Sequence, residues 1–247
     1  MILFEILTLI LISLILSELF FYTICVYTNK KFQWLIIKKD LMPVLSKKGL
    51  DKFNQHGYDS ELGWIRKPET SDVELGKDGK TKWHIDKIGC RLNPGFENIT
   101  SHISCYGDSF TFCRQVNDDQ TWEHYLSKLF SNNVKNFGVG NYGFDQALLR
   151  LKREYDKNQT KIVIMGIVPD TVSRIMSVWK HYYEYGNTFA FKPKFIIKNE
   201  ELILLNNPIN EFKKYSQYHK FLEHIQQHDY FYFKKFKREL IQFPYSI

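Results

Sequence analysis

The chain has 247 residues, of which 44% are hydrophobic and 16% aromatic, and its formal net charge is +7. This length suits one medium-sized globular domain with appendages. The positive charge is mostly lysine spread over several segments, without a helix-turn-helix, zinc-finger or aromatic RNA-binding pattern. The composition therefore argues against a nucleic-acid partner and fits attraction to anionic lipid headgroups.

Residues 1–27 are almost continuously apolar and are predicted to form a transmembrane anchor. A helix of this length can cross a hydrocarbon core about 30 Å thick. Glu5 can sit at the headgroup level, whereas Glu18 needs a partner or a proton inside a membrane. No basic segment precedes the run and no small-residue cleavage site follows it, which argues against a cleaved signal peptide. The alternative is a helix buried in protein.

The segment after the apolar run, residues 28–57, is predicted to be a juxtamembrane amphipathic linker. Within it, "FQWLIIKKDLMPVL" is expected to lie along the membrane surface. No lysine or arginine precedes the span, and several lysines follow it: Lys30, Lys31, Lys38, Lys39, Lys47, Lys48 and Lys52. The positive-inside rule then predicts a single-pass membrane protein with its body on the cytoplasmic side.

Strand and helix patterns alternate along the body of the protein, residues 58–247. An irregular, hairpin-bearing segment comes first, over residues 58–98. Three short apolar runs then predict strands: "HISCYG", "VKNFGVG" and "KIVIMGIV". The last is continuously apolar, which is typical of a parallel strand covered on both faces. Between them, "DDQTWEHYLSKLF" and "DQALLRLKREYDK" have helical spacing, and Asp118 or Asp119 is the expected N-cap of the first.

This alternation predicts an α/β fold, a three-layer sandwich with a mainly parallel sheet. Ligands of such sheets bind at the carboxyl ends of the strands. The sequences Gly107-Asp108-Ser109 and Gly138-Val139-Gly140-Asn141 both fall at such ends. Further along, residues 194–205 are predicted to form a hairpin with Asn199 at its turn, and residues 210–238 to be mainly helical.

Two of these segments, "CYGDSFTF" and "NFGVGNYGFDQ", resemble the SGNH, or GDSL-type, hydrolase family. The resemblance covers about residues 58–174, since "DSELGWIRKP" and "GCRLNPG" are similar to the lead-in of some membrane-linked members. It implies an SGNH/flavodoxin-like sandwich with Ser109 as the nucleophile. The N–H groups of Ser109 and Gly138 would hold the oxyanion, and Asp108 would support the loop. The alternative is a helix-capping serine without a catalytic role.

The chain departs from the family pattern in two places. The third block, "GIVPDT", has Pro169 where the family carries an asparagine, so Asn141 is a substitute candidate for the oxyanion hole. Asp170, Thr171 and Arg174 either line the pocket or cap the next helix. The family's Asp-x-x-His is missing as well. Its histidine base is therefore expected beyond Ile247 or among three histidines that also suit surface or packing roles: His219, His224 and His228.

The function expected from this resemblance is a membrane-anchored serine esterase or O-acyl transferase. Its substrate would be an acyl ester, of the surface-polysaccharide or lipid-linked kind, and no metal or organic cofactor is implied. The alternative is a non-catalytic, membrane-tethered binding or assembly module. The four cysteines have no metal-ligand spacing and are expected to be reduced thiols, with a Cys90–Cys113 disulfide as the alternative.

Overall fold

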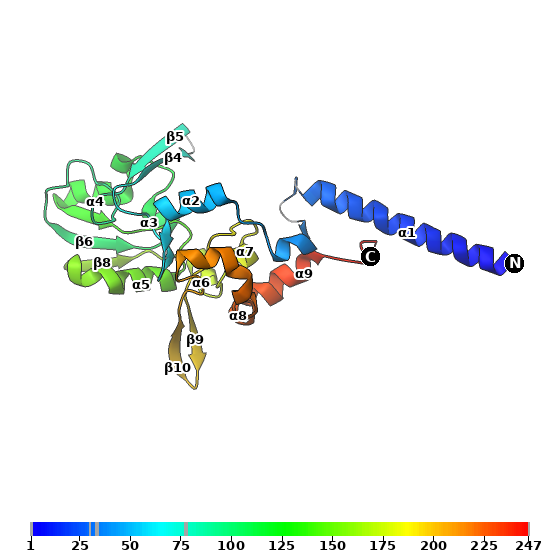
Figure 1. Ribbon diagram of the computed structural model, residues 1–247. Helices are drawn as coiled ribbons and strands as arrows, with labels where there is room; N and C mark the ends of the chain where they lie inside the picture. Colours follow the sequence, from blue (N-terminus) through cyan, green and yellow to red (C-terminus); the bar gives the residue numbers. More distant parts are fainter. Residues whose placement is uncertain (1, 30, 33–34, 77–78, 247) are drawn as a thin grey trace.

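The structure, a computed structural model, describes residues 2–29, 31–32, 35–76 and 79–246. It is a mixed α/β fold with several small sheets and one long N-terminal helix, α1 (Ile2–Asn29). In Figure 1, α1 extends away from the body of the protein, and its side chains are exposed rather than buried in protein. Its 28 residues are mostly apolar, which suits a membrane anchor or a signal sequence.

Glu18 of α1 is paired by the C-terminal segment. Its carboxylate accepts the N–H groups of Tyr245, at 2.6 Å, and of Ser246, at 3.0 Å. The rings of Tyr22 and Tyr245 are in edge contact, with their centroids 5.2 Å apart. The one carboxylate that the sequence marks as costly within α1 therefore has hydrogen-bond partners.

The linker contains β1 (Ile36–Ile37), a 3₁₀ turn (Lys38–Leu41) and α2 (Lys47–His56). β1 pairs in parallel with β11 (Leu240–Ile241), and both of its residues are buried. The side chains of Ile36 and Ile37 therefore pack into the protein, whereas Met42 and Val44 of the same stretch are exposed. The predicted position of the linker along the membrane surface stays a prediction. Gln33 and Trp34 of the same segment lie outside the described residues.

Two small hairpins form the lead-in that the sequence predicted. The first pairs β2 (Tyr58–Asp59) with β3 (Gly63–Trp64), and the second pairs β4 (Ser71–Gly76) with β5 (Gly79–His84). The second hairpin contacts residues 114–118: the N–H of Lys82 donates to the Asn117 side-chain oxygen at 2.9 Å. Arg91 follows this hairpin, and its guanidinium donates hydrogen bonds to the carbonyl oxygens of Phe112, Cys113 and Val116.

The central sheet has three parallel strands in the order β7–β6–β8. Its strands and the helices next to them have these bounds: β6 (Ser101–Tyr106), α3 (Ser109–Phe112), α4 (Trp122–Phe130), β7 (Asn133–Asn136), α5 (Phe144–Glu154), β8 (Ile162–Met165) and α6 (Pro169–Arg174). A 3₁₀ turn, Asp118–Gln120, precedes α4, and a second one, Tyr155–Lys157, follows α5. The predicted order of strands and helices is confirmed here.

The two faces of β6 pack against different helices. Ile103 and Cys105 share an apolar cluster with Leu126 of α4, whereas Tyr106 shares one with Leu151 of α5. Alternation along a strand sends neighbouring side chains to opposite faces of the sheet. Helices α4 and α5 therefore cover opposite faces.

Two local predictions around this sheet were wrong. β8 is an edge strand with Ile162 53% exposed, so its apolar run does not mean burial on both faces. The N-cap of α4 is Thr121, whose hydroxyl accepts the His124 N–H at 3.1 Å. Asp118 is instead held by Arg91, at 2.8 Å, and by His84, at 2.6 Å.

The second half of the chain is built around an aromatic core, defined by Trp179, Tyr182, Phe191, Tyr215, Tyr218 and Phe236. The elements around it are α7 (Lys180–Tyr183), β9 (Lys194–Lys198), β10 (Glu201–Leu205), the 3₁₀ segment Phe212–Phe221, α8 (Leu222–His228), the π-helical turn Tyr232–Phe236 and α9 (Lys237–Glu239). β9 and β10 form the predicted hairpin, with Asn199 at φ 51° in its turn. The four cysteines are free thiols, so Cys90 and Cys113 are not bridged.

Candidate functional site

Ser109 occupies the first position of α3, directly after the central strand β6. Asp108 is the N-cap of this short helix, and its carboxylate accepts the Phe110 N–H at 2.9 Å. Ser109 is half-buried. Within the part of the chain that the structure describes, neither its hydroxyl nor its N–H takes part in a hydrogen bond as donor. The first N–H groups of a helix lack partners inside the helix, so this amide is available to a ligand.

Asp108 ties the serine turn to two neighbouring segments. Its side chain is 2% exposed and pairs with Arg174 at the end of α6, with 2.9 Å between Oδ2 and Nη1. The same Arg174 nitrogen donates to the carbonyl oxygen of Tyr142 at 3.3 Å. Through this pair, the turn after β6, the turn after β7 and the helix after β8 are held together.

Glycines at the ends of the three strands let α3 lie close to the sheet. A Cβ atom on Gly107 or on Gly166 would overlap the hydroxyl of Thr111, and one on Gly138 would overlap the backbone nitrogen of Phe112. Any larger residue at these positions would push α3 away from the strand ends. The close approach fixes where Ser109 lies relative to the turn after β7.

The backbone N–H of Gly138, which the resemblance assigns to the oxyanion hole, already has an acceptor. It donates to the Asn136 side-chain oxygen at 2.9 Å, and the Asn136 amide donates in turn to the Thr111 carbonyl oxygen at 2.7 Å. Two residues further on, the N–H groups of Gly140 and Asn141 donate to no other described residue. Asn141 has φ 69°, a left-handed conformation that asparagine tolerates better than most residues.

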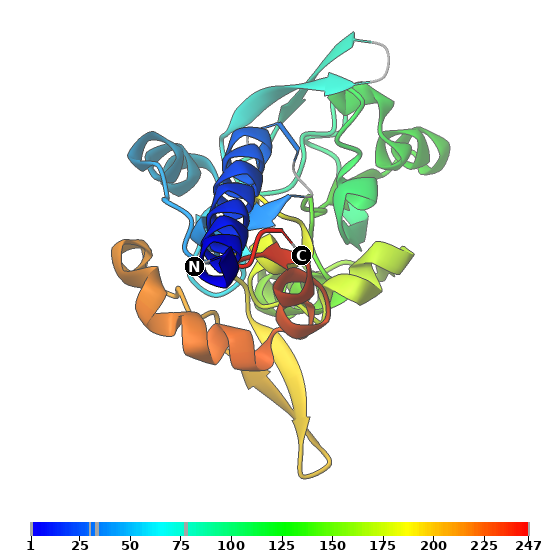
Figure 2. The same cartoon turned by 90° about the vertical axis from the view of Figure 1, so that its right-hand side faces the viewer.

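The three candidate histidine bases lie in the second half of the fold, around the aromatic core. His219 lies in the 3₁₀ segment before α8, and His224 and His228 lie in α8 with ring centroids 4.5 Å apart. Both views place α8 apart from α3 (Figures 1 and 2). Among the described residues, none of the three contacts the Ser109 turn, so the structure does not bring the candidate base and nucleophile together.

Asp229, which follows His228 in the sequence, is a buried structural residue. Its carboxylate accepts the N–H groups of Val178, at 2.6 Å, and Trp179, at 3.0 Å, and the hydroxyl of Ser177. Burial raises the pKa of this carboxyl against the effect of those hydrogen bonds. It connects the segment before α7 to the end of α8 and orients no histidine.

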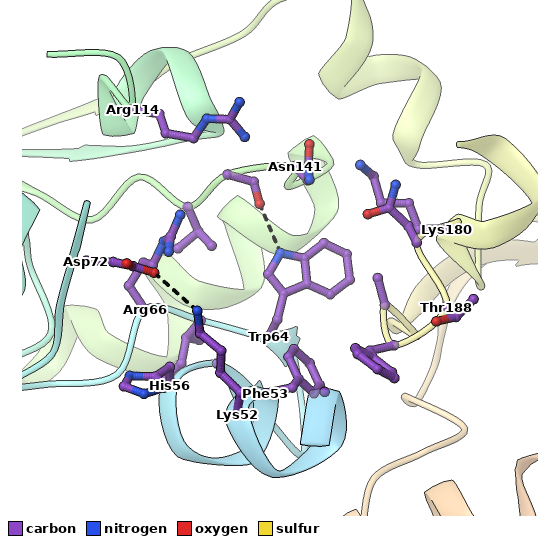
Figure 3. Close-up of a pocket in the computed structure, with 18 of the residues that line it drawn as sticks. Lys52, Phe53, His56, Trp64, Arg66, Asp72, Arg114, Asn141, Lys180 and Thr188 are labelled. Atoms are coloured by element: carbon purple, nitrogen blue, oxygen red, sulfur yellow. Dashed lines mark hydrogen bonds and ion pairs between the residues drawn. The ribbon is translucent and has the colours of Figure 1, made fainter. Parts of the chain in front are cut away.

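A cavity of about 480 Å³ lies beside the turn after β7. Its wall is formed by α2, the segment from β3 to β4, Arg114, the Asn141 turn, the start of α7 and residues 186–190 (Figure 3). The polar side chains that line it are Lys52, His56, Arg66, Asp72, Arg114, Asn141, Lys180, Asn187 and Thr188. The apolar part of the wall includes Phe53, Trp64, Val139 and Phe189. Ser109 lies outside this lining.

Two of the cationic groups in the wall are positioned by one carboxylate. Glu74 of β4 accepts from Arg66 at 3.0 Å and pairs with the Nε atom of Arg114 at 2.8 Å. The Arg66 guanidinium also stacks over the Trp83 ring, 4.2 Å from its centroid, and burial lowers its pKa. Desolvation similarly lowers the pKa of Lys180 to about 8, although Glu184 pairs with it at 2.6 Å.

The sequence contains no short-range signal for this cavity. Arg66, Arg114 and Lys180 are far apart in the sequence. The contact of the Trp64 indole N–H with the Gly140 carbonyl, at 3.0 Å, joins residues 76 positions apart. The one local clue is Asn141 inside "GVGNYG", the candidate substitute for the asparagine that the family pattern places at Pro169.

The described residues hold no group of three His, Cys, Asp or Glu side chains placed to bind a metal ion. No known family model matches the chain. No curated protein matches it either.

Proposed function

We propose that this chain is a membrane-anchored serine esterase or O-acyl transferase of the SGNH type, with Ser109 as the nucleophile. The observation that carries the proposal is the placement of Ser109 at the start of α3, just beyond the end of the central strand. It is half-buried, and its hydroxyl has no hydrogen-bond partner among the described residues. A nucleophilic serine needs such a position because its oxygen must reach a bound carbonyl carbon. The sheet with helices on opposite faces is, in this proposal, the α/β sandwich of that family.

In the proposed reaction, the Ser109 oxygen attacks the carbonyl carbon of an acyl ester. The alcohol leaves with a proton, and the acyl group remains on Ser109 until water or a sugar hydroxyl takes it. The negative oxygen of the intermediate needs N–H donors. We assign this role to the Ser109 amide and to Asn141 in place of Gly138, because the Gly138 amide already donates to Asn136.

The proton of Ser109 must pass to a general base for this reaction to proceed. Within the described ranges no histidine contacts Ser109, so none of the described histidines is placed to accept this proton. The substrate class follows from the resemblance alone: an acyl ester on a polysaccharide or a lipid-linked sugar.

The membrane side is part of the same proposal. The lysines that follow α1 favour a body on the cytoplasmic side, under the positive-inside rule. An exposed 28-residue apolar helix supports the anchor itself.

A second candidate function, a non-catalytic membrane-tethered binding module, is favoured by a specific observation. The cavity beside the sheet is lined by the Asn141 turn and by cationic side chains, and Ser109 is not part of its wall. A binding module needs this cavity and does not need the serine hydroxyl.

Labelling with a fluorophosphonate probe separates the two candidates. The esterase proposal predicts labelling of the wild type and loss of labelling in Ser109→Ala. Ser173→Ala is the matched control, since this half-buried hydroxyl also lies on a short helix and already donates to the Pro169 carbonyl oxygen. Equal labelling of the wild type and Ser109→Ala, or no labelling of either, would favour the binding module.

A further inference from the structure

The cavity beside the Asn141 turn has more cationic groups than anionic ones in its wall. Lys52, Arg66, Arg114 and Lys180 line it, and Asp72 is the one carboxylate among the described lining residues. Lys52 and Asp72 face each other at 3.9 Å. The remaining positive groups are held by Glu74 and Glu184, neither of which is a lining residue.

These contacts leave hydrogen-bond donors unused on the cavity side. Arg114 uses only its Nε atom for Glu74, so both of its terminal nitrogens are free within the described structure, and its side chain is 46% exposed. Asn141 also lines the cavity, and its side-chain amide has no hydrogen-bond partner among the described residues. Figure 3 shows Arg114, Asn141 and Lys180 around the same part of the cavity. A wall rich in free donors is matched by a ligand rich in acceptors.

Another part of the cavity wall is aromatic and consists of Phe53, Trp64 and Phe189. The Trp64 indole N–H is fixed by the Gly140 carbonyl oxygen, and the rings of Phe53 and Phe189 stack with centroids 5.8 Å apart. The volume of about 480 Å³ falls within the usual range for small organic ligands, roughly 300–1,000 Å³. A bare inorganic anion would leave the aromatic surface unused.

We propose that this cavity binds an organic oxyanion: a phosphate or carboxylate group attached to a ring-containing body. The charged group meets Arg114 and the Asn141 turn, and the body lies on Trp64, Phe53 and Phe189. The Glu74 carboxylate holds the Arg66 and Arg114 guanidinium groups in position and is not itself a ligand contact. The site functions in this way whether or not Ser109 reacts.

The test is isothermal titration calorimetry on the full chain in phosphatidylcholine nanodiscs. Glucose 1-phosphate and glucuronate are the charged probes, and glucose is the uncharged one. We expect both charged probes to bind at least tenfold more tightly than glucose. Arg114→Gln should weaken them about tenfold or more, because a charge-assisted contact is lost. Arg238→Gln, an exposed change on α9 outside the cavity, should leave affinity unchanged.

A second cavity variant guards against misfolding. Asn141→Gly keeps the left-handed backbone and its N–H but removes the side-chain amide, and its affinity for glucose 1-phosphate should fall less than that of Arg114→Gln. Ser109→Ala should bind as the wild type does, so failure of the esterase proposal would leave this result intact. Undetectable binding of both charged probes, or equal affinity in the wild type and Arg114→Gln, would overturn the proposal.

Nanodiscs that contain phosphatidylinositol, whose phosphate carries a six-membered ring, identify the source of the ligand. If an anionic lipid headgroup occupies the cavity, glucose 1-phosphate should bind more weakly there than in phosphatidylcholine alone. Equal affinity in the two lipids assigns the cavity to a soluble oxyanion.

Discussion

Several charged side chains in this protein are buried, and each has a definite structural consequence. Arg174 is 8% exposed, and Asp108 is its only carboxylate partner among the described residues. Glu123 is 1% exposed, and one of its carboxyl oxygens has no hydrogen-bond partner in the structure. At the residue scale, stability therefore depends on whether such a group is paired or neutral.

Asp108→Ala is expected to lower the free energy of unfolding by about 3–5 kcal/mol, because it leaves the Arg174 charge buried without a partner. Urea denaturation of the full chain in detergent measures this change. The matched control is Lys213→Ala, which removes a fully exposed ion pair with Glu211 and should not shift the transition. An unchanged transition in Asp108→Ala would show that the Asp108–Arg174 pair does not hold the serine turn.

Glu123 should make stability depend on pH. Burial raises the pKa of its carboxyl from 4.5 to about 8, so between these values the folded state binds more protons than the unfolded state. Stability should therefore fall as the pH rises from 4.5 towards 8, by at most about 1.4 kcal/mol per pH unit from this group. Glu123→Gln should flatten the profile, whereas the exposed Glu97→Gln should not. Urea midpoints at pH 5, 6.5 and 8 test this, and parallel profiles for wild type and Glu123→Gln would refute it.

At the scale of elements, the close approach of α3 to the strand ends positions Ser109. This approach depends on glycines whose Cβ atoms would meet backbone or hydroxyl atoms of α3. Two glycines in the turn after β7 differ in this respect. A Cβ atom on Gly138 would meet α3, whereas one on Gly140 would meet no heavy atom, so the two positions give a matched pair of substitutions.

Gly138→Ala should destabilise the fold by about 1–3 kcal/mol, because the new Cβ would overlap the Phe112 backbone nitrogen. Gly140→Ala should change stability by less than about 0.5 kcal/mol, since no heavy atom lies within 4 Å of its Cβ position. Thermal unfolding of the two variants compares them directly. A similar loss of stability in both variants would mean that α3 does not lie against the strand ends.

The order of elements from residue 101 to 165 could be predicted because it depends on local apolar spacing. The details that failed depend on distant partners. The sequence predicts Asp118 or Asp119 as the N-cap of α4, but Arg91 and His84, 27 and 34 positions away, hold the Asp118 carboxylate. Thr121 caps the helix instead. The cavity could not be predicted for the same reason, since residues far apart in the sequence, from α2 to the segment after α7, form its wall.

At the scale of the whole molecule, the protein consists of the apolar helix α1 and a globular body. The C-terminal segment of the body contacts α1. The parallel β1–β11 pair and the contacts of Tyr245 and Ser246 with Glu18 place this segment beside α1. The hairpin β9–β10 projects from the body and provides an exposed site for a topology probe (Figure 1).

The proposed cytoplasmic location predicts the labelling of a thiol at the hairpin tip. Lys198→Cys should react with a membrane-impermeant maleimide only after the cells are permeabilised. The unsubstituted chain is the control for its four natural thiols. Reaction of Lys198→Cys in intact cells would place the body on the other side of the membrane.

The central claim is that Ser109 is a nucleophile, and mass-spectrometric mapping of a fluorophosphonate adduct tests it most directly. The full chain is treated with the probe and digested, and the modified residue is identified by fragmentation. We expect a single phosphonylated peptide, modified at Ser109, as for a serine presented after the central strand. An unmodified Ser109 peptide, or modification only at another residue, would contradict the claim.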